Sequence, residues 1–257
     1  ATANAYLKAL DKVSDRETKA FIIRQLQLLG KDECVDTLAS YLNDESLSGP
    51  AARALSAIRT DNAKKVLVAS LMRRSGTPKT QKNIIRAIAD VQIADAENVL
   101  KVMLSSSDEN MQKEVLYALS RVGSKASLGD LAAAAEKAGY KMEKTGANEA
   151  YIALIKRVLE QGDTKDAEKA ANDLLKKSTK AGMTQTREAA LQILLAAKPE
   201  AATKNLLSAL KDTDKGYRNA ALNFASGFAD QNVYIEVMKH MLKAKPEVKV
   251  DILNRSQ

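Results

Sequence analysis

The stretch QTREAALQILLAA (185–197), followed closely by EAATKNLLSALK (200–211), decides the fold class of this chain. Large apolar residues in both pieces recur three or four positions apart, which is the spacing of one face of an α-helix. Pro199 stands between the two pieces, at a place where the first turn of a helix tolerates a missing N–H group. The stretch therefore predicts two consecutive amphipathic helices joined by a short turn.

The same pattern of helix, turn and helix recurs along the chain, so that seven segments can be superimposed. Each segment has an anchor residue directly before a large apolar residue of its first helix. The anchors are Gln25, Ala54, Ala87, Ala118, Arg157, Ala190 and Ala221, and they lie 29, 33, 31, 39, 33 and 31 residues apart. Repeats in this range are typical of a solenoid, in which each unit buries its apolar face only against its neighbours. We therefore expect an all-α fold, a right-handed α-α superhelix of about seven helical hairpins that forms a single domain over residues 1–257.

Turn residues place the boundaries of these hairpins. The expected hairpins span 17–43, 50–75, 80–105, 110–138, 149–178, 185–211 and 216–243. The glycines that could close a first helix in a left-handed conformation are Gly30, Gly123 and Gly162. The aspartates that could cap a second helix are Asp61, Asp95 and Asp163. The leucines that follow three of the anchors, and that we expect between neighbouring repeats, are Leu119, Leu191 and Leu222.

Three segments depart from the regular repeat. AGYKMEKTGAN (138–148) produces the longest spacing, and it is either a protruding loop or an ordinary variable connection. YLKALDKVS (6–14) resembles a second helix without its first, and PEVKVDILNR (246–255) resembles the first helix of an eighth repeat. Because terminal repeats normally carry polar caps, we expect the sequence to be a fragment of a longer protein.

Composition excludes several classes of protein. Hydrophobic residues make up 45% of the chain, which excludes a disordered protein. Aromatic residues make up only 4%, and 4 Pro and 11 Gly are too few for the turns of an all-β protein of this length. No apolar run approaches the roughly 18 residues of a membrane span. No signal peptide is visible, although the chain begins at Ala1 without Met, as either a mature protein or a trimmed fragment would.

The signature RxxAL, at Arg187–Leu191 and Arg218–Leu222, and the segment Ala118–Gly123 give the repeat a family resemblance. The pattern resembles HEAT and HEAT-like repeats, which form armadillo-like superhelices, and the short period is similar to that of phycobilin-lyase-type proteins. The resemblance covers almost the whole chain. It implies a scaffold that binds or spaces other proteins.

A narrower resemblance rests on KAFIIRQLQLLGKDE (19–33), AGYKMEKTGANEAYIALIKRVLEQGD (138–163) and YRNAALNFA (217–225). These phrases resemble the repeat region of large bacterial envelope proteins, in which HEAT-like repeats precede a concanavalin-like domain described as a glycoside or 3-keto-disaccharide hydrolase. The resemblance implies a non-catalytic interaction module in the cell envelope or periplasm. Its partner would be a protein or a neighbouring domain of the same chain, and the catalytic domain would lie beyond residue 257.

Residues that could carry chemistry are sparse. His240 is the only histidine, so a site with two or three histidine ligands is impossible. Cys34 is the only cysteine, which excludes an intramolecular disulfide, and no histidine lies near it in sequence to activate it as a nucleophile. Paired carboxylates such as Asp212 and Asp214 stand in turns, where acids are common. Since glycine-rich phosphate loops are also absent, we expect no enzyme activity, no metal and no cofactor in this chain.

The charge of the chain is concentrated in residues 51–89. This stretch has nine basic residues and one acidic residue, a net charge of +8 that equals the net charge of the whole chain. Its candidate binding residues are Arg73, Arg74, Lys79 and Lys82, which flank the turn SGTP. They form either a binding patch for an acidic partner or a solvated face, since cations are also favourable at a helix C-terminus.

A stand-alone protein that binds a polyanion or DNA through residues 51–89 is the alternative function. Sites that handle nucleic-acid bases use aromatic side chains. The stretch has no Phe, Tyr or Trp. This absence argues against nucleic acid as a partner.

Overall fold

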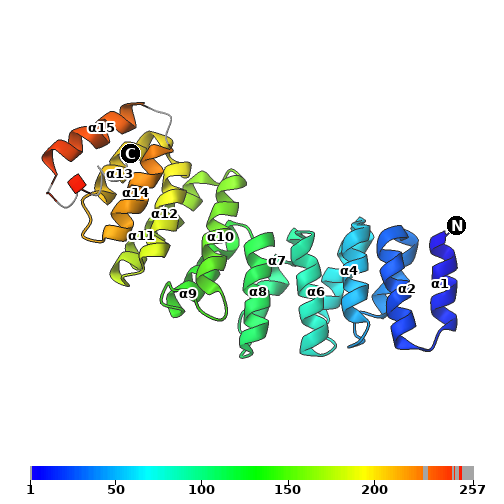
Figure 1. Cartoon of the computed structure of the whole chain (residues 1–257). Coiled ribbons are helices and arrows are strands. Elements are labelled where there is room, and N and C mark those ends of the chain that lie inside the picture. The colour runs from blue at the N-terminus through cyan, green and yellow to red at the C-terminus, as the bar shows by residue number, and fades with distance from the viewer. Residues whose placement is uncertain (1, 228–230, 245, 247–248, 251–257) are drawn as a thin grey trace. The chain divides into compact units, whose positions relative to one another are not determined.

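A computed structural model describes residues 2–227, 231–244, 246 and 249–250 (Figure 1). Within these ranges every regular element is a helix and no strand occurs, which confirms the all-α fold class. The chain forms two compact units: unit 1 comprises residues 1–127 and 144–146, and unit 2 comprises residues 128–143 and 147–257. A single domain and a right-handed superhelix through both units stay predictions.

Unit 1 is a stack of antiparallel helices in two layers. Its α-helices are α1 (Thr2–Lys12), α2 (Arg16–Leu29), α3 (Val35–Ser40), α4 (Ser48–Ile58), α5 (Asp61–Met72), α6 (Pro78–Asp90), α7 (Glu97–Met103) and α8 (Glu109–Val122). Its 3-10 helices are η1 (Asp32–Cys34), η2 (Ala94–Ala96) and η3 (Lys125–Ser127). Helices α2, α4, α6 and α8 pack side by side, and Figure 1 shows them as one layer. The second helices of the hairpins, α3, α5 and α7, pack behind this layer.

Unit 2 repeats the arrangement with longer helices. Its elements are α9 (Leu128–Lys137), α10 (Ala147–Glu160), α11 (Thr164–Lys180), α12 (Thr184–Ala197), η4 (Pro199–Ala201), α13 (Ala202–Ala209), α14 (Lys215–Ser226) and α15 (Gln231–Lys243). Helix α12 packs between α10 and α14, and α11 packs against both α10 and α12. Apolar side chains from α12, α13, α14 and α15 then form one core cluster.

The predicted hairpins are confirmed in the described part of the chain, because a helical pair lies at each of the seven expected spans. Leu119, Leu191 and Leu222 are buried, as the repeat register predicts. Helix α1 includes most of the stretch 6–14. The stretch 246–255 lies largely outside the described residues.

Of the three aspartates expected at N-cap positions, Asp163 occupies one, whereas Asp61 and Asp95 do not. Thr60 caps α5, because its backbone is extended and its hydroxyl accepts a hydrogen bond from the N–H of Ala63 at 3.2 Å. Asp61 is therefore the first residue of that helix. Asp95 lies inside η2, ahead of α7, and Asp163 precedes α11 without a capping hydrogen bond from its side chain. Side chains that do cap helices are Asp15, Thr77, Asp108 and Asp214.

The expected left-handed glycines are confirmed at one position of three. Gly162 has φ of +89°, whereas Gly30 and Gly123 are extended, with φ of −73° and −65°. Gly30 is required for another reason: a Cβ atom there would lie 2.5 Å from the carbonyl oxygen of Leu26 and 3.2 Å from Cys34 Sγ. The chain turns so tightly after α2 that no side chain fits.

Candidate functional site

The surroundings of the single cysteine and the single histidine give neither residue a catalytic or metal-binding arrangement among the described residues. Cys34 is fully buried at the end of η1, and burial raises the pKa of its thiol, which disfavours the nucleophilic thiolate. Burial, followed by the charge of Lys211, lowers the pKa of His240 on α15. No group of three potential metal ligands occurs among the residues that the structure describes.

The paired carboxylates Asp212 and Asp214 hold a buried arginine. Both form ion pairs with the guanidinium of Arg187, which also lies over the ring of Tyr217 at 4.0 Å. Asp214 in addition caps α14 by accepting a hydrogen bond from the N–H of Tyr217 at 3.2 Å. Because these contacts join one repeat to the next, the two carboxylates have a structural role.

Two of the nine basic residues in 51–89 have an acidic partner. Lys64 lies 3.5 Å from Asp61, and Arg86 forms a two-pronged pair with Glu114, with Nε 2.8 Å from Oε2. The hydrogen bond from Arg86 to Glu114 raises the pKa of the guanidinium. The basic residues without an ion pair to any described residue are Arg53, Arg59, Lys65, Arg73, Arg74, Lys79 and Lys82.

Four of these unpaired cations gather where α5 ends and α6 begins. Arg73 and Arg74 follow α5, Lys79 lies in the first turn of α6, and Lys82 follows one turn later. We call these four residues the basic turn. Arg53 and Lys65 lie within α4 and α5, and Arg59 follows α4, so these three cations lie outside the basic turn.

Hydrogen bonds fix the backbone that carries the basic turn. The Nδ2 group of Asn43 donates to Ser75 Oγ at 3.2 Å, and Nε2 of Gln81 donates to the carbonyl oxygen of Arg74 at 3.3 Å. Thr77 caps α6. Gly76 has φ of +93°, and a Cβ atom there would lie 2.4 Å from Thr80 Oγ1, so only glycine fits. The four cations therefore project from a defined turn.

Acidic residues flank the basic turn on both sides. The bond between Asn43 and Ser75 places the turn ahead of α4, with Asp44 and Glu45, next to it. Helix α8 packs beside α6, so its preceding turn, with Asp108 and Glu109, is the other neighbour. The positive charge of the basic turn thus lies between acidic residues of the two neighbouring turns.

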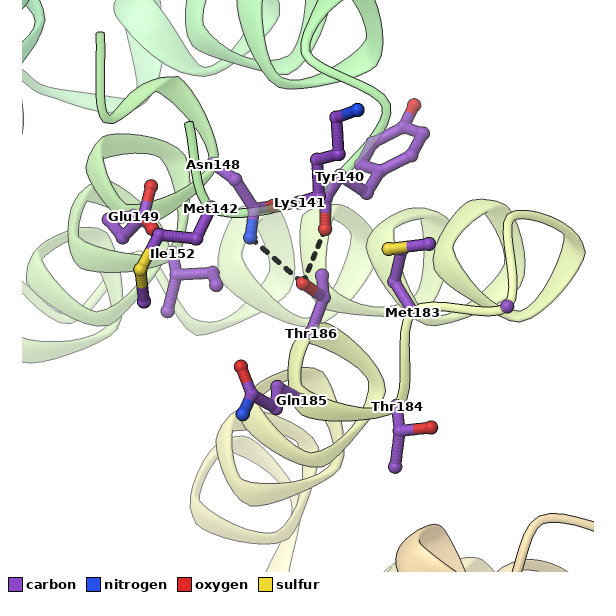
Figure 2. Close-up of a pocket in the computed structure, with 11 residues that line it drawn as sticks. Tyr140, Lys141, Met142, Asn148, Glu149, Ile152, Met183, Thr184, Gln185 and Thr186 are labelled. Carbon is purple, nitrogen blue, oxygen red and sulfur yellow. Dashed lines mark hydrogen bonds between the residues drawn. The ribbon is translucent and has the colours of Figure 1, made fainter. Parts of the chain in front are cut away.

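A pocket in unit 2 was not predicted from the sequence. It has a volume of about 350 Å³ and lies between residues 140–142 and the first turn of α12 (Figure 2). Its apolar lining includes Met142, Ile152 and Met183, and its polar lining includes Asn148 and Thr186. The long repeat spacing at 138–148 was the only sequence signal near it, and spacing carries no information about a cavity.

A short hydrogen-bond network borders this pocket. Thr186 donates its hydroxyl proton to the carbonyl oxygen of Tyr140 at 2.7 Å, and Nδ2 of Asn148 donates to Thr186 Oγ1 at 2.8 Å (Figure 2). Asn148 is only 4% exposed, and its Oδ1 atom has no hydrogen-bond partner. Tyr140 has φ of +58°, which is uncommon for a residue with a side chain.

Comparison with known families supports the repeat assignment. Residues 68–152 match the family model for HEAT repeats. The matched segment runs from α5 into α10 and is therefore similar to HEAT repeats over less than half of the chain. A search of curated proteins finds no match. HEAT repeats commonly serve as scaffolds for protein interactions, and the all-helical hairpins of both units agree with that class of protein.

No helix in the described ranges is long and apolar enough to cross a membrane.

Proposed function

We propose that this chain is a non-catalytic interaction module whose unit 1 binds a short acidic segment of a protein partner at the basic turn. The observation that carries the proposal is the group of four exposed or half-exposed cations without ion pairs, held by a hydrogen-bonded turn. Because the turn is already ordered, binding loses little conformational entropy of the site.

The flanking acids favour a short segment over a long polyanion. Asp44 is already paired with Arg16, at 3.8 Å. A nucleic-acid backbone that followed successive repeats would meet Glu45 on one side of the basic turn and Asp108 and Glu109 on the other. Repulsion there would oppose the attraction at Arg73 and Arg74. Met72, which is 64% exposed beside Arg73, would instead contact an apolar residue of a protein partner.

The wider setting of the module is a separate proposal, supported by the sequence resemblance alone. In this proposal the chain is part of a larger bacterial envelope protein, lies in the periplasm, and is attached to a carbohydrate-active domain. The sequence of the full-length gene product tests it. A β-rich concanavalin-like segment after residue 257 would support it, and a stop codon there would favour a stand-alone protein.

Binding at the basic turn is tested with a fluorescently labelled acidic peptide that contains leucine, compared with a DNA duplex of equal charge. The wild-type protein should prefer the peptide, and affinity should fall steeply with salt because exposed charges are screened. Changing Arg73, Arg74, Lys79 and Lys82 together to Gln should abolish peptide binding without changing helicity. Tighter binding of the duplex would favour the polyanion alternative.

A matched control separates the basic turn from net charge. Lys165, Lys169, Lys176 and Lys180 are exposed on α11, and the structure shows no ion pair for them with a described residue. Their simultaneous change to Gln removes the same charge from unit 2. Equal losses of affinity, or equal shifts in elution from heparin, would mean that only net charge matters and that the basic turn is a solvated face.

The proposal assigns no catalytic step to this chain. We expect purified protein not to hydrolyse disaccharides, glycosides or nucleic acids, because its cysteine is buried as a thiol and its paired carboxylates Asp212 and Asp214 bind Arg187. Turnover that a point change within residues 1–257 abolishes would contradict this expectation.

A further inference from the structure

The pocket of unit 2 borders an acceptor atom that the protein itself does not satisfy. A threonine hydroxyl has one proton, and Thr186 donates it to the carbonyl oxygen of Tyr140. The group of Asn148 that faces Thr186 must therefore be the NH₂ donor, and exchanging the amide oxygen and nitrogen would break the network. The orientation of the amide is fixed, and Oδ1 of Asn148 is left as a buried acceptor without a partner.

The same pocket is bounded by a helix start that no side chain caps. Met183 occupies the N-cap position of α12 and makes no capping hydrogen bond, and residues Met183–Thr186 line the pocket. The first N–H groups of a helix have no intrahelical acceptor and carry partial positive charge. An occupant would therefore find donors at α12 and, once lining side chains shift, an acceptor at Asn148.

We propose that this pocket binds a neutral peptide segment, through one backbone amide and an adjacent apolar side chain. An amide carries a donor and an acceptor side by side, which matches Asn148 Oδ1 and the first turn of α12. Two charged residues, Lys141 and Glu149, line the pocket, and both are exposed. Because their charges are opposite, the pocket favours a neutral group over an anion or a cation.

The apolar walls favour a peptide over a sugar. Met142, Ile152 and Met183 present thioether and aliphatic surface, which adapts to apolar side chains of different shape. The ring of Tyr140 points away from the other labelled side chains in Figure 2 and offers no stacking face there. Oδ1 is inaccessible in this structure, so binding requires lining side chains to shift, and Met142, at 77% exposure, is the least constrained. This inference concerns unit 2 and does not depend on the basic turn of unit 1.

The test is an NMR titration of the whole chain with N-acetyl-leucine methylamide as the probe. We expect saturable shifts of the backbone amides of residues 184–186 and of the side-chain NH₂ of Asn148. Asn148→Leu preserves size but removes the acceptor together with the hydrogen bond to Thr186, and it should weaken binding about tenfold or more while the melting temperature falls only slightly. Thr186→Val, which removes the same hydrogen bond but leaves Oδ1 in place, should lower the melting temperature to a similar extent and weaken binding much less, which distinguishes a binding role of Oδ1 from a structural one.

Two further variants keep the test decisive. Met142→Glu places a charge on an exposed side chain of the lining and should weaken binding without affecting folding. Asn172→Leu removes an exposed asparagine of α11, outside the pocket, and should leave binding unchanged. No saturable shift with wild-type protein would mean that Oδ1 is satisfied by water alone. Stronger shifts with methyl glucoside than with the blocked leucine would overturn the peptide assignment, as would unchanged affinity in Asn148→Leu.

Discussion

The two units fill the same repeat position with opposite chemistry. The position compared is the one three residues before each anchor. In unit 1 it is always apolar, and its residues are Ile22, Ala51, Ile84 and Val115. Unit 2 begins with Leu154 at that position and then has Arg187 and Arg218. All seven side chains are buried.

The difference shows that the repeat register determines burial but not polarity. A buried arginine is tolerated only where the next turn supplies acceptors, because an unpaired buried charge is strongly destabilising. Asp212 and Asp214 supply them for Arg187, and the carbonyl oxygens of Asp212 and Thr213 supply them for Arg218, at 2.9 and 3.0 Å. Counted from the anchor, the residue of unit 1 that corresponds to Asp214 is Met111, which is buried.

The largest loss of stability should follow from placing an arginine at this position in unit 1. Ile84→Arg introduces a charge at a buried position of α6, and we expect a loss of about 3–5 kcal/mol in the free energy of unfolding, measured by urea denaturation. Adding Met111→Asp should restore part of the loss. A conservative control, Ile84→Met, should cost less than about 1.5 kcal/mol. If Ile84→Arg alone costs less than about 1 kcal/mol, acceptors already exist in unit 1 and the two units are equivalent.

The buried leucines that follow the anchors should be similarly sensitive to truncation in the two units. Truncating Leu119 of unit 1, or Leu191 or Leu222 of unit 2, to Ala should cost about 2–5 kcal/mol by denaturant unfolding, because each change leaves a cavity between packed helices. Changes below about 1 kcal/mol at two of the three sites would show that the repeat register is wrong.

Removing the buried arginine of unit 2 should have a smaller effect. Arg187→Met retains much of the apolar stem but loses hydrogen bonds to Asp212 and Asp214, and we expect a loss of about 1.5–3 kcal/mol, measured by thermal and urea unfolding. Arg187→Lys should not restore it, because an ammonium cannot reproduce the two-pronged geometry or the stacking on Tyr217. The exposed Arg73→Met of unit 1 is the control and should change stability by less than about 0.5 kcal/mol. Equal effects at both arginines would remove the distinction between paired and unpaired cations.

Periodicity predicted the helices well because burial in a repeat depends on spacing alone. Leu119 and Leu222 could be identified as core residues from their distance to an anchor. The caps could not be assigned as reliably, since adjacent polar residues such as Thr60 and Asp61 are both suitable and backbone geometry selects between them.

The candidate sites were predictable only in part. Sequence proximity was enough to place four cations around one turn, namely Arg73, Arg74, Lys79 and Lys82. Their binding role stays a prediction. Their acidic neighbours Asp44 and Glu45 come from another repeat, so only the stacking of helices reveals them. The pocket depends on contacts between Tyr140, Asn148 and Thr186, which lie up to 46 residues apart. No local pattern records such contacts.

The smallest expected effect is on how the free energy of unfolding changes with pH under acidic conditions. A hydrogen bond from Thr184 lowers the pKa of Asp214 below its ordinary value of 3.8, with further lowering from the N–H groups of Tyr217 and Gly216 and from Arg187, against an opposing effect of burial. The folded state then binds fewer protons than the unfolded state. Ionised Asp214 thus contributes stability that is present above pH 3.8 and is lost as pH falls through the lower folded value.

Asp214→Asn keeps a capping side chain but removes this charge. Unfolding free energies measured from about pH 2 to 5 should depend less on pH in the variant, and the loss at neutral pH should be about 1 kcal/mol or less. Asp108→Asn is the matched variant in unit 1, where the carboxylate caps α8 through Asn110 at 2.8 Å and no described arginine contacts it. We expect a smaller change there. The same flattening in both variants would mean that helix capping alone, and not the additional contacts of Asp214 with Thr184 and Arg187, couples stability to pH.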